Sequence, residues 1–93
     1  MTEKSSGLKR LIGSEVVVDT AGPTIYLGTL REICPDGLWL ENADLHDRTE
    51  GHVTKERYVC EARQHGICPN RRRVFIRMEV VLSCSALADV VID

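Results

Sequence analysis

Short runs in which apolar and polar residues alternate make up most of the chain, and they predict a protein built mainly from β-strands. These runs are rich in Val, Ile, Leu and Thr, as strands favour. Turn chemistry separates them, with Gly and Pro in residues 20–23 and Pro-Asp-Gly at residues 35–37 as a tight hairpin turn. The pattern predicts strands at 15–19, 24–34, 38–43, 72–76 and 80–87.

Two other segments carry apolar residues at helical spacing. In residues 6–13, the apolar face is Leu8, Leu11 and Ile12, and Gly13 is a typical residue to end a helix. In residues 55–65, the apolar face is made by Tyr58, Val59 and Ala62, between a capping Thr54 and a terminating Gly66. Residues 44–53 are polar and predict a loop.

Five short strands bury both faces most readily when the sheet curls on itself. The sequence therefore predicts a mainly β protein, a small, strongly bent five-stranded barrel with an N-terminal helix and a helical insert between the third and fourth strands. Eight residues are predicted to be buried in it: Leu30, Ile33, Leu38, Leu40, Val74, Ile76, Val81 and Cys84.

The length of 93 residues allows a single domain over 1–93, with a flexible tail at 1–5 and a loop-plus-helix insert at 44–71. Aromatic residues make up only 4% of the chain, so the core must be aliphatic. No apolar run reaches the roughly 18–20 residues that cross a bilayer, and no signal peptide precedes the four cysteines. We expect no membrane partner, reduced cysteines and a cytoplasmic location.

Four segments, in this order and spacing, resemble the Sm and Sm-like (Lsm) family of small RNA-associated ring proteins. They are Leu-Ile-Gly at 11–13 before the first strand, Gly-Thr-Leu at 28–30, Leu-Trp-Leu-Glu-Asn-Ala at 38–43, and Ile-Arg-Met-Glu-Val-Val at 76–81. The resemblance covers about 8–43 and 72–87. It implies the Sm-like (SH3-like) barrel, a homo-oligomeric ring of five to seven subunits and binding of single-stranded RNA.

The same resemblance points to Asp36, Gly37 and Arg77 as RNA-binding residues at the turns. Two positions depart from the family pattern: Gly37 stands where an Asn contacts a base, and Met78 stands where a Gly follows the Arg. These departures imply a degraded uridine pocket and weak or absent binding to oligo-uridine.

A basic segment interrupts a chain of net charge −2: residues 55–77 contain seven basic and two acidic residues. Within it, Arg71, Arg72 and Arg73, together with Arg77, offer forked donors suited to phosphate and form a second set of RNA-binding candidates. The alternative is that these arginines are solvated on an edge strand and discourage aggregation. The small number of aromatic residues counts against RNA binding, because single-stranded RNA stacks on aromatic rings.

Five strands in a meander leave two unpaired edges, one around 72–76 and one around 80–87. An apolar edge left bare is an aggregation hazard, which head-to-tail pairing between subunits removes. The interface residues we expect are Phe75, Trp39, Val80 and Leu82.

Asp44, His46, Asp47, Glu50 and His52 are possible metal ligands, because carboxylates with imidazoles suit transition metals. The alternative is an ordinary polar loop. Cys60, His65 and Cys68 make a weak zinc candidate, since no Cys-x-x-Cys pair is present. No nucleophile is tied to a base by any motif, so we expect neither an enzyme nor a cofactor.

Three functions follow from these observations: a ring-forming module that binds RNA through a basic edge, an oligomeric scaffold that binds protein instead, and, remotely, a metal-binding protein that uses the 44–52 loop.

Overall fold

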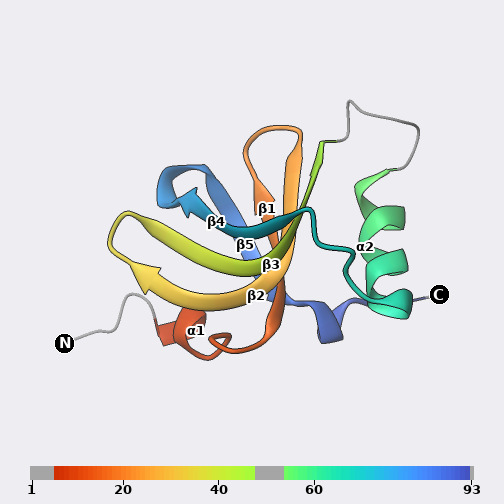
Figure 1. The fold of residues 1–93 in the computed structure, drawn as a ribbon, viewed down its shortest axis with the longest axis horizontal. Helices are drawn as coiled ribbons and strands as arrows, with labels where there is room; N and C mark the ends of the chain where they lie inside the picture. Colours follow the sequence, from red (N-terminus) through yellow and green to blue (C-terminus); the bar gives the residue numbers. More distant parts are fainter. Residues whose placement is uncertain (1–5, 48–53, 93) are drawn as a thin grey trace.

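The computed structural model describes residues 6–47 and 54–92. Along the chain these residues form two α-helices, five strands and two 3₁₀ turns (Figure 1). The elements are α1 (Ser6–Lys9), β1 (Glu15–Thr20), β2 (Thr24–Cys34), β3 (Gly37–Asp47), α2 (Lys55–His65), β4 (Arg71–Arg77), η1 (Met78–Val80), β5 (Val81–Ala86) and η2 (Leu87–Asp89). The prediction of a mainly β protein with an N-terminal helix and a helix between the third and fourth strands is confirmed.

The five strands form one antiparallel sheet in the order β4-β3-β2-β1-β5, so β4 and β5 are its two edges. The register of β2 against β3 shifts twice, between Leu27 and Thr29 and between Leu30 and Glu32. Such irregularities bend and twist a strand. Gly28 lies at the first of them, and a Cβ there would lie 3.1 Å from the Ala43 Cα, so the two backbones approach closely at this point.

The concave side of the sheet encloses what we call the inner core. Its fully or almost fully buried members are Val16, Val18, Leu30, Leu38, Leu40, Ala43 and Ile76. The other four residues predicted to be buried, Ile33, Val74, Val81 and Cys84, are only partly buried against it. Three of these four lie on β4 or β5, and an edge strand has a neighbour on one side only.

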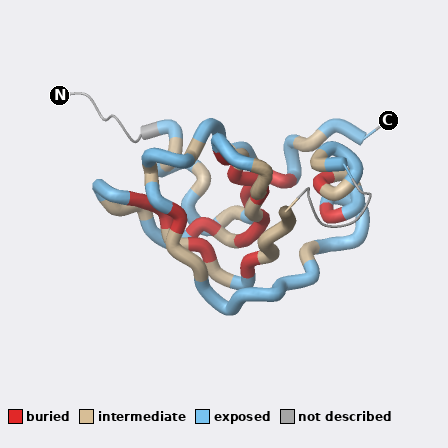
Figure 2. The backbone as a smooth tube through the Cα atoms, turned by 90° about the horizontal axis from the view of Figure 1, so that it is seen from above, coloured by how far each residue is buried: buried red, intermediate tan, exposed pale blue. Residues whose placement is uncertain are grey.

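A second cluster, which we call the outer core, lies on the opposite face of β1 and β2 under α2. Its buried members are Val17, Ile25, Leu27, Val59, Ala62 and Leu87. Figure 2 shows the buried positions of α2 on the side that faces the sheet. Residues of β1 therefore alternate between the two cores, and the helical stripe predicted from Tyr58, Val59 and Ala62 packs as expected, with Tyr58 partly buried.

Helix α2 begins and ends as its capping residues predict. The Thr54 hydroxyl accepts a hydrogen bond from the Arg57 backbone N–H at 3.2 Å. At the other end, Gly66 has a φ of 93° and its N–H donates to the Ala62 carbonyl at 2.8 Å. This positive φ is the reason that a glycine stands there.

Three predicted boundaries are wrong. Residues 44–47 belong to β3 rather than to a loop, because they continue the ladder with β2 as far as the Thr24–Asp47 pair. Helix α1 ends at Lys9, and Ile12, beyond it, is exposed instead of sharing the apolar face. Val80 belongs to the 3₁₀ turn before β5. The predicted tail at 1–5 lies outside the described residues, and none of the helices described is long and apolar enough to cross a membrane.

Candidate nucleic-acid interface

The β2–β3 turn and the β4–β5 connection lie together at the end of the sheet opposite α2 (Figure 1). The Met78 N–H donates to the Asp36 carbonyl at 2.9 Å, and Gly37 pairs with Arg77 across β3 and β4. The structure thus brings Asp36, Gly37 and Arg77 to one place. The Arg77 guanidinium forms an ion pair with Glu79, so part of its charge is already neutralised.

Gly37 is buried beneath the ring of Phe75. A Cβ at this position would lie 2.5 Å from the Phe75 Cζ and would also collide with the Ile76 carbonyl oxygen. Because the second collision is with backbone, a small side-chain movement does not relieve it. Position 37 therefore has no room for a side chain, and an Asn cannot stand there to meet a base.

The arginines of β4 separate onto two sides. By strand alternation Arg71, Arg73 and Arg77 lie on the outward side, while Arg72 lies on the side that carries Val74 and Ile76. Arg71 donates to the Asn70 carbonyl at 3.1 Å. Within the described part of the chain, none of the three arginines at the start of β4 has a carboxylate partner.

Two aromatic residues share the outward side with Arg73. Trp39 and Phe75 are register partners on β3 and β4, with ring centroids 5.1 Å apart and ring planes inclined by 54°. The Arg73 guanidinium lies 4.8 Å from the Trp39 ring centroid, within cation–π distance. Sequence reasoning named these residues separately; the period-two spacing of Arg71, Arg73 and Phe75 is the signal that would have joined them.

The β5 edge exposes apolar side chains. Leu82 is 71% exposed on β5 itself and Val80 is 37% exposed in the turn before it. In the described sheet, neither β4 nor β5 has a second neighbour. Both edges therefore offer unpaired backbone donors and acceptors.

Two of the candidate metal ligands on β3, Asp44 and His46, contact Tyr58 of α2. The Tyr58 hydroxyl donates to an Asp44 carboxylate oxygen, and the His46 ring stacks on the Tyr58 ring at 4.2 Å. Burial, and then the hydrogen bond to Asp44, raise the pKa of Tyr58 far above its usual range. His46 Nε2 is buried, and no described residue forms a hydrogen bond with it.

The other candidate metal ligands do not form a cluster among the described residues. Asp47 ends β3, and His52 and Glu50 lie outside the described residues. Among the residues described, no three His, Cys, Asp or Glu side chains converge as metal ligands, and this includes Cys60, His65 and Cys68. All four cysteines are free thiols, and burial raises the pKa of Cys84 to about 11.

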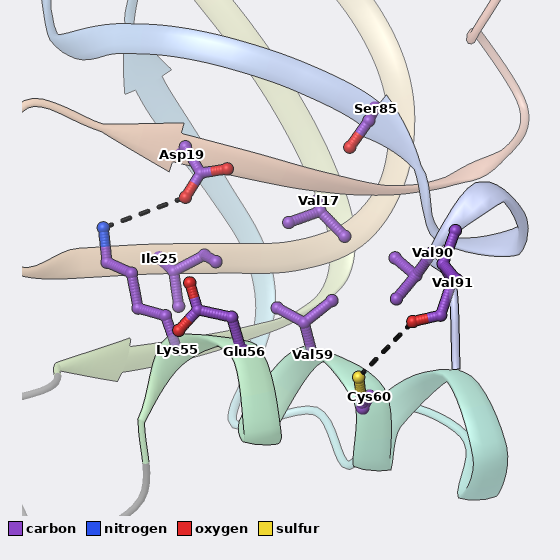
Figure 3. Close-up of a pocket in the computed structure, with 10 residues that line it drawn as sticks. All are labelled: Val17, Asp19, Ile25, Lys55, Glu56, Val59, Cys60, Ser85, Val90 and Val91. Atoms are coloured by element: carbon purple, nitrogen blue, oxygen red, sulfur yellow. Dashed lines mark hydrogen bonds and ion pairs between the residues drawn. The ribbon is translucent and has the colours of Figure 1, made fainter. Parts of the chain in front are cut away.

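A cavity of about 280 Å³ lies between α2, the sheet and the C-terminal residues (Figure 3). Its floor is apolar, from Val17, Ile25 and Val59, and the ion pair of Lys55 with Asp19, at 3.8 Å, stands at its rim. Glu56, Cys60 and Ser85 add polar groups to its lining, and the cavity lies against the outer core.

No protein-family model and no curated protein sequence matches this chain. Solved structures do match. The Sm protein of Pyrococcus abyssii, solved in complex with a uridine heptamer, superposes with a TM-score of 0.62 at 15% identity, over 91% of this chain and 99% of that one. The SmAP (LSm) protein of Methanococcus vannielii gives 0.59 at 17% identity, over 91% and 96%. The fold is Sm-like.

Among the other Sm-like neighbours, the SmAP1 heptamer of Pyrobaculum aerophilum has a TM-score of 0.58 at 19% identity, over 92% of this chain and 95% of that one. A chain of the NatC complex bound to CoA gives 0.56 at 15% identity, over 85% and 82%. The Sm-like fold thus serves in assemblies of different kinds, and function has to be argued from this chain's own surface.

Proposed function

We propose that this protein is an Sm-like module that assembles into a ring of five to seven copies and holds single-stranded RNA on the arginines at the start of β4. Two unpaired sheet edges support the ring, because pairing β4 of one subunit with β5 of the next satisfies both and covers Val80 and Leu82. The Pyrobaculum aerophilum neighbour is a heptamer.

The observation that carries the RNA proposal is that Arg71, Arg72 and Arg73 have no carboxylate partner among the residues that the structure describes. Arginines without carboxylate partners on an exposed strand bind phosphate well, because the guanidinium offers two parallel donors. The neighbour from Pyrococcus abyssii was solved with a uridine heptamer. Free thiols at all four cysteines fit a cytoplasmic location, and the proposed role is binding without a catalytic step.

The end of the sheet that carries Asp36, Gly37 and Arg77, which we call the turn end, contributes less to this binding than the β4 arginines do. Asp36 is acidic and exposed, Gly37 has no side chain and no room for one, and Arg77 is paired with Glu79. We therefore propose that RNA binding follows the phosphate backbone and shows little preference for uridine.

The second candidate is a ring that binds no RNA and acts as a protein scaffold. The missing side chain at Gly37 and the net charge of −2 favour it. The two candidates share the ring and differ only in the role of the β4 arginines.

Light scattering after gel filtration, together with RNA-binding anisotropy over a salt series, tests the proposal. We expect a particle of five to seven copies of the 10.4 kDa chain. We expect similar affinity for oligo-uridine and for mixed-sequence RNA. Changing Arg71, Arg72 and Arg73 to Gln should flatten the plot of log affinity against log salt by about 2, since each phosphate contact to a single strand contributes about 0.7.

Arg57→Gln, on the exposed side of α2, is the matched control and should leave the salt slope unchanged. A stable monomer would overturn the ring. A ring that shows no salt-dependent RNA binding would leave the scaffold as the function.

A further inference from the structure

The outward surface of β3 and β4 gathers half of the aromatic residues of this chain. The protein has one Trp, one Phe and two Tyr, and Trp39 and Phe75 lie in contact and partly exposed. Both tyrosines instead pack against the cores: Tyr26 against the inner core and Tyr58 against the outer core. The Trp39–Phe75 pair has no such role, because its strand neighbours Leu38, Leu40 and Ile76 fill the inner core from the opposite side of the sheet.

The charges around this pair leave Arg73 free to contact it. Glu41 lies opposite Arg73 in the β3–β4 register and would be its natural partner. However, Glu41 accepts a hydrogen bond from Arg31 at 2.8 Å. The Arg73 guanidinium is held over Trp39 instead, at 4.8 Å from the ring centroid. A planar cation therefore lies over the Trp39 ring, which itself contacts the Phe75 ring, on a partly exposed face.

Gly37 keeps the Phe75 ring in this arrangement. The ring covers the bare backbone of Gly37, and any side chain there would displace it. The absence of a side chain at position 37, which removes a base-contacting group from the turn, thus favours an aromatic surface two residues further along β3, at the Trp39–Phe75 pair. The missing base contact in the turn and the position of the Phe75 ring thus both follow from the glycine at position 37.

Formation of the ring leaves the Trp39 part of this surface open. Backbone pairing along the β4 edge adds a strand beside β4, whereas Trp39 lies on β3, which is already flanked by β2 and β4. The outward face of an interior strand is not covered when the sheet is extended in its own plane. Trp39 is therefore better placed for a ligand than for the subunit interface.

We propose that Trp39, Phe75 and Arg73 form a stacking site for the bases of single-stranded RNA, with Arg71 on an adjacent phosphate. This inference rests on the proposed RNA binding and names a surface for it away from the turn end. Aromatic rings stack on the face of any base, and the guanidinium of an arginine both stacks and binds phosphate. Binding at such a site tolerates many sequences, in agreement with the lack of a uridine pocket.

The single tryptophan makes the site directly observable, because its fluorescence reports Trp39 alone. We expect a single-stranded RNA of mixed sequence, added to the assembled protein, to quench this emission as a base stacks on the indole. Trp39→Leu should weaken RNA binding about 5- to 150-fold, the range for losing one base stack. Trp39→Phe, which keeps an aromatic face, should retain most of the affinity.

Three readouts separate stacking from a structural role. Trp39→Leu should leave the salt slope unchanged, because it removes no phosphate contact, whereas Arg71→Gln should reduce that slope. Light scattering and circular dichroism should show the same assembly and fold for Trp39→Leu as for the unmodified chain.

The outcomes are distinct. If the unmodified protein binds no RNA, the proposed function fails and the inference fails with it. If it binds RNA without quenching, or if Trp39→Leu binds as tightly, only the inference is overturned. If Trp39→Leu breaks the ring, Trp39 belongs to the subunit interface and the stacking site is wrong.

Discussion

The inner core and the outer core share β1 and β2 but differ in what holds their parts together. The inner core joins strands that are also linked by backbone hydrogen bonds, so side-chain packing and strand pairing depend on each other. The outer core joins the sheet to a helix that has no backbone ladder with it. The difference suggests that the two cores open by separate routes.

A few side-chain contacts hold α2 against the sheet in addition to the apolar packing. The Tyr58 hydroxyl donates to Asp44, and Lys55 pairs with Asp19 at 3.8 Å. The Arg63 guanidinium donates to the Ala88 carbonyl at 3.2 Å, which ties α2 to η2 rather than to a strand. The Tyr58–Asp44 hydrogen bond is partly buried, whereas the other two contacts lie at the surface, where such contacts are weak. We therefore expect α2 to detach locally at a lower free energy than the whole domain unfolds.

The largest expected effect is in the inner core. Leu40 is fully buried, and Leu40→Ala should lower the free energy of unfolding by about 2–5 kcal/mol, from lost transfer energy and a cavity. Denaturant unfolding measures this change. If α2 opens by its own route, hydrogen exchange of the α2 amides should stay the same in this variant. Equal acceleration at every amide would contradict the comparison between the cores.

The inner core was accessible to sequence reasoning because its residues follow the alternation of the strands. Leu30, Leu38, Leu40 and Ile76 were predicted from period two alone and are buried. Alternation could not predict that residues 44–47 belong to a strand rather than to a loop. Polar residues such as Asp44 and His46 are poor strand formers, but the long β2–β3 ladder and the contacts of Asp44 and His46 with Tyr58 hold them extended.

The candidate site was predicted only in part, and for a physical reason. Sequence comparison with the Sm motifs treated Gly37 as a replaced base contact, while the structure shows it as the place where the Phe75 ring lies. That contact joins residues 38 positions apart in the sequence, so no local pattern reports it. Glu41 pairs with Arg31, which leaves the Arg73 guanidinium to lie over Trp39. This arrangement also depends on how the strands pair, so a local sequence pattern does not report it.

A smaller effect is expected in the outer core. Val59→Ala removes two methyl groups from the α2–sheet contact and should cost about 1.5 kcal/mol. The α2 amides should then exchange about tenfold faster, in contrast to their response to Leu40→Ala. The control is Val91→Ala, the same substitution at a side chain that is 79% exposed, where little should change. Unaltered α2 exchange in Val59→Ala would show that the helix does not open separately.

The smallest effect concerns the start of α2 and needs no change in either core. The Thr54 hydroxyl accepts the Arg57 N–H at 3.2 Å, and one such cap contributes about 1 kcal/mol. Thr54→Ala should therefore speed exchange of the α2 amides about fivefold, and Thr54→Ser, which keeps the acceptor, should restore most of the protection. Because Thr54 is exposed and is a member of neither core, the loss reports how stable the helix is. If α2 is part of one cooperative unit with the sheet, Thr54→Ala will instead accelerate the slowest β2 and β3 amides to the same extent, and the distinction between the two cores will fail.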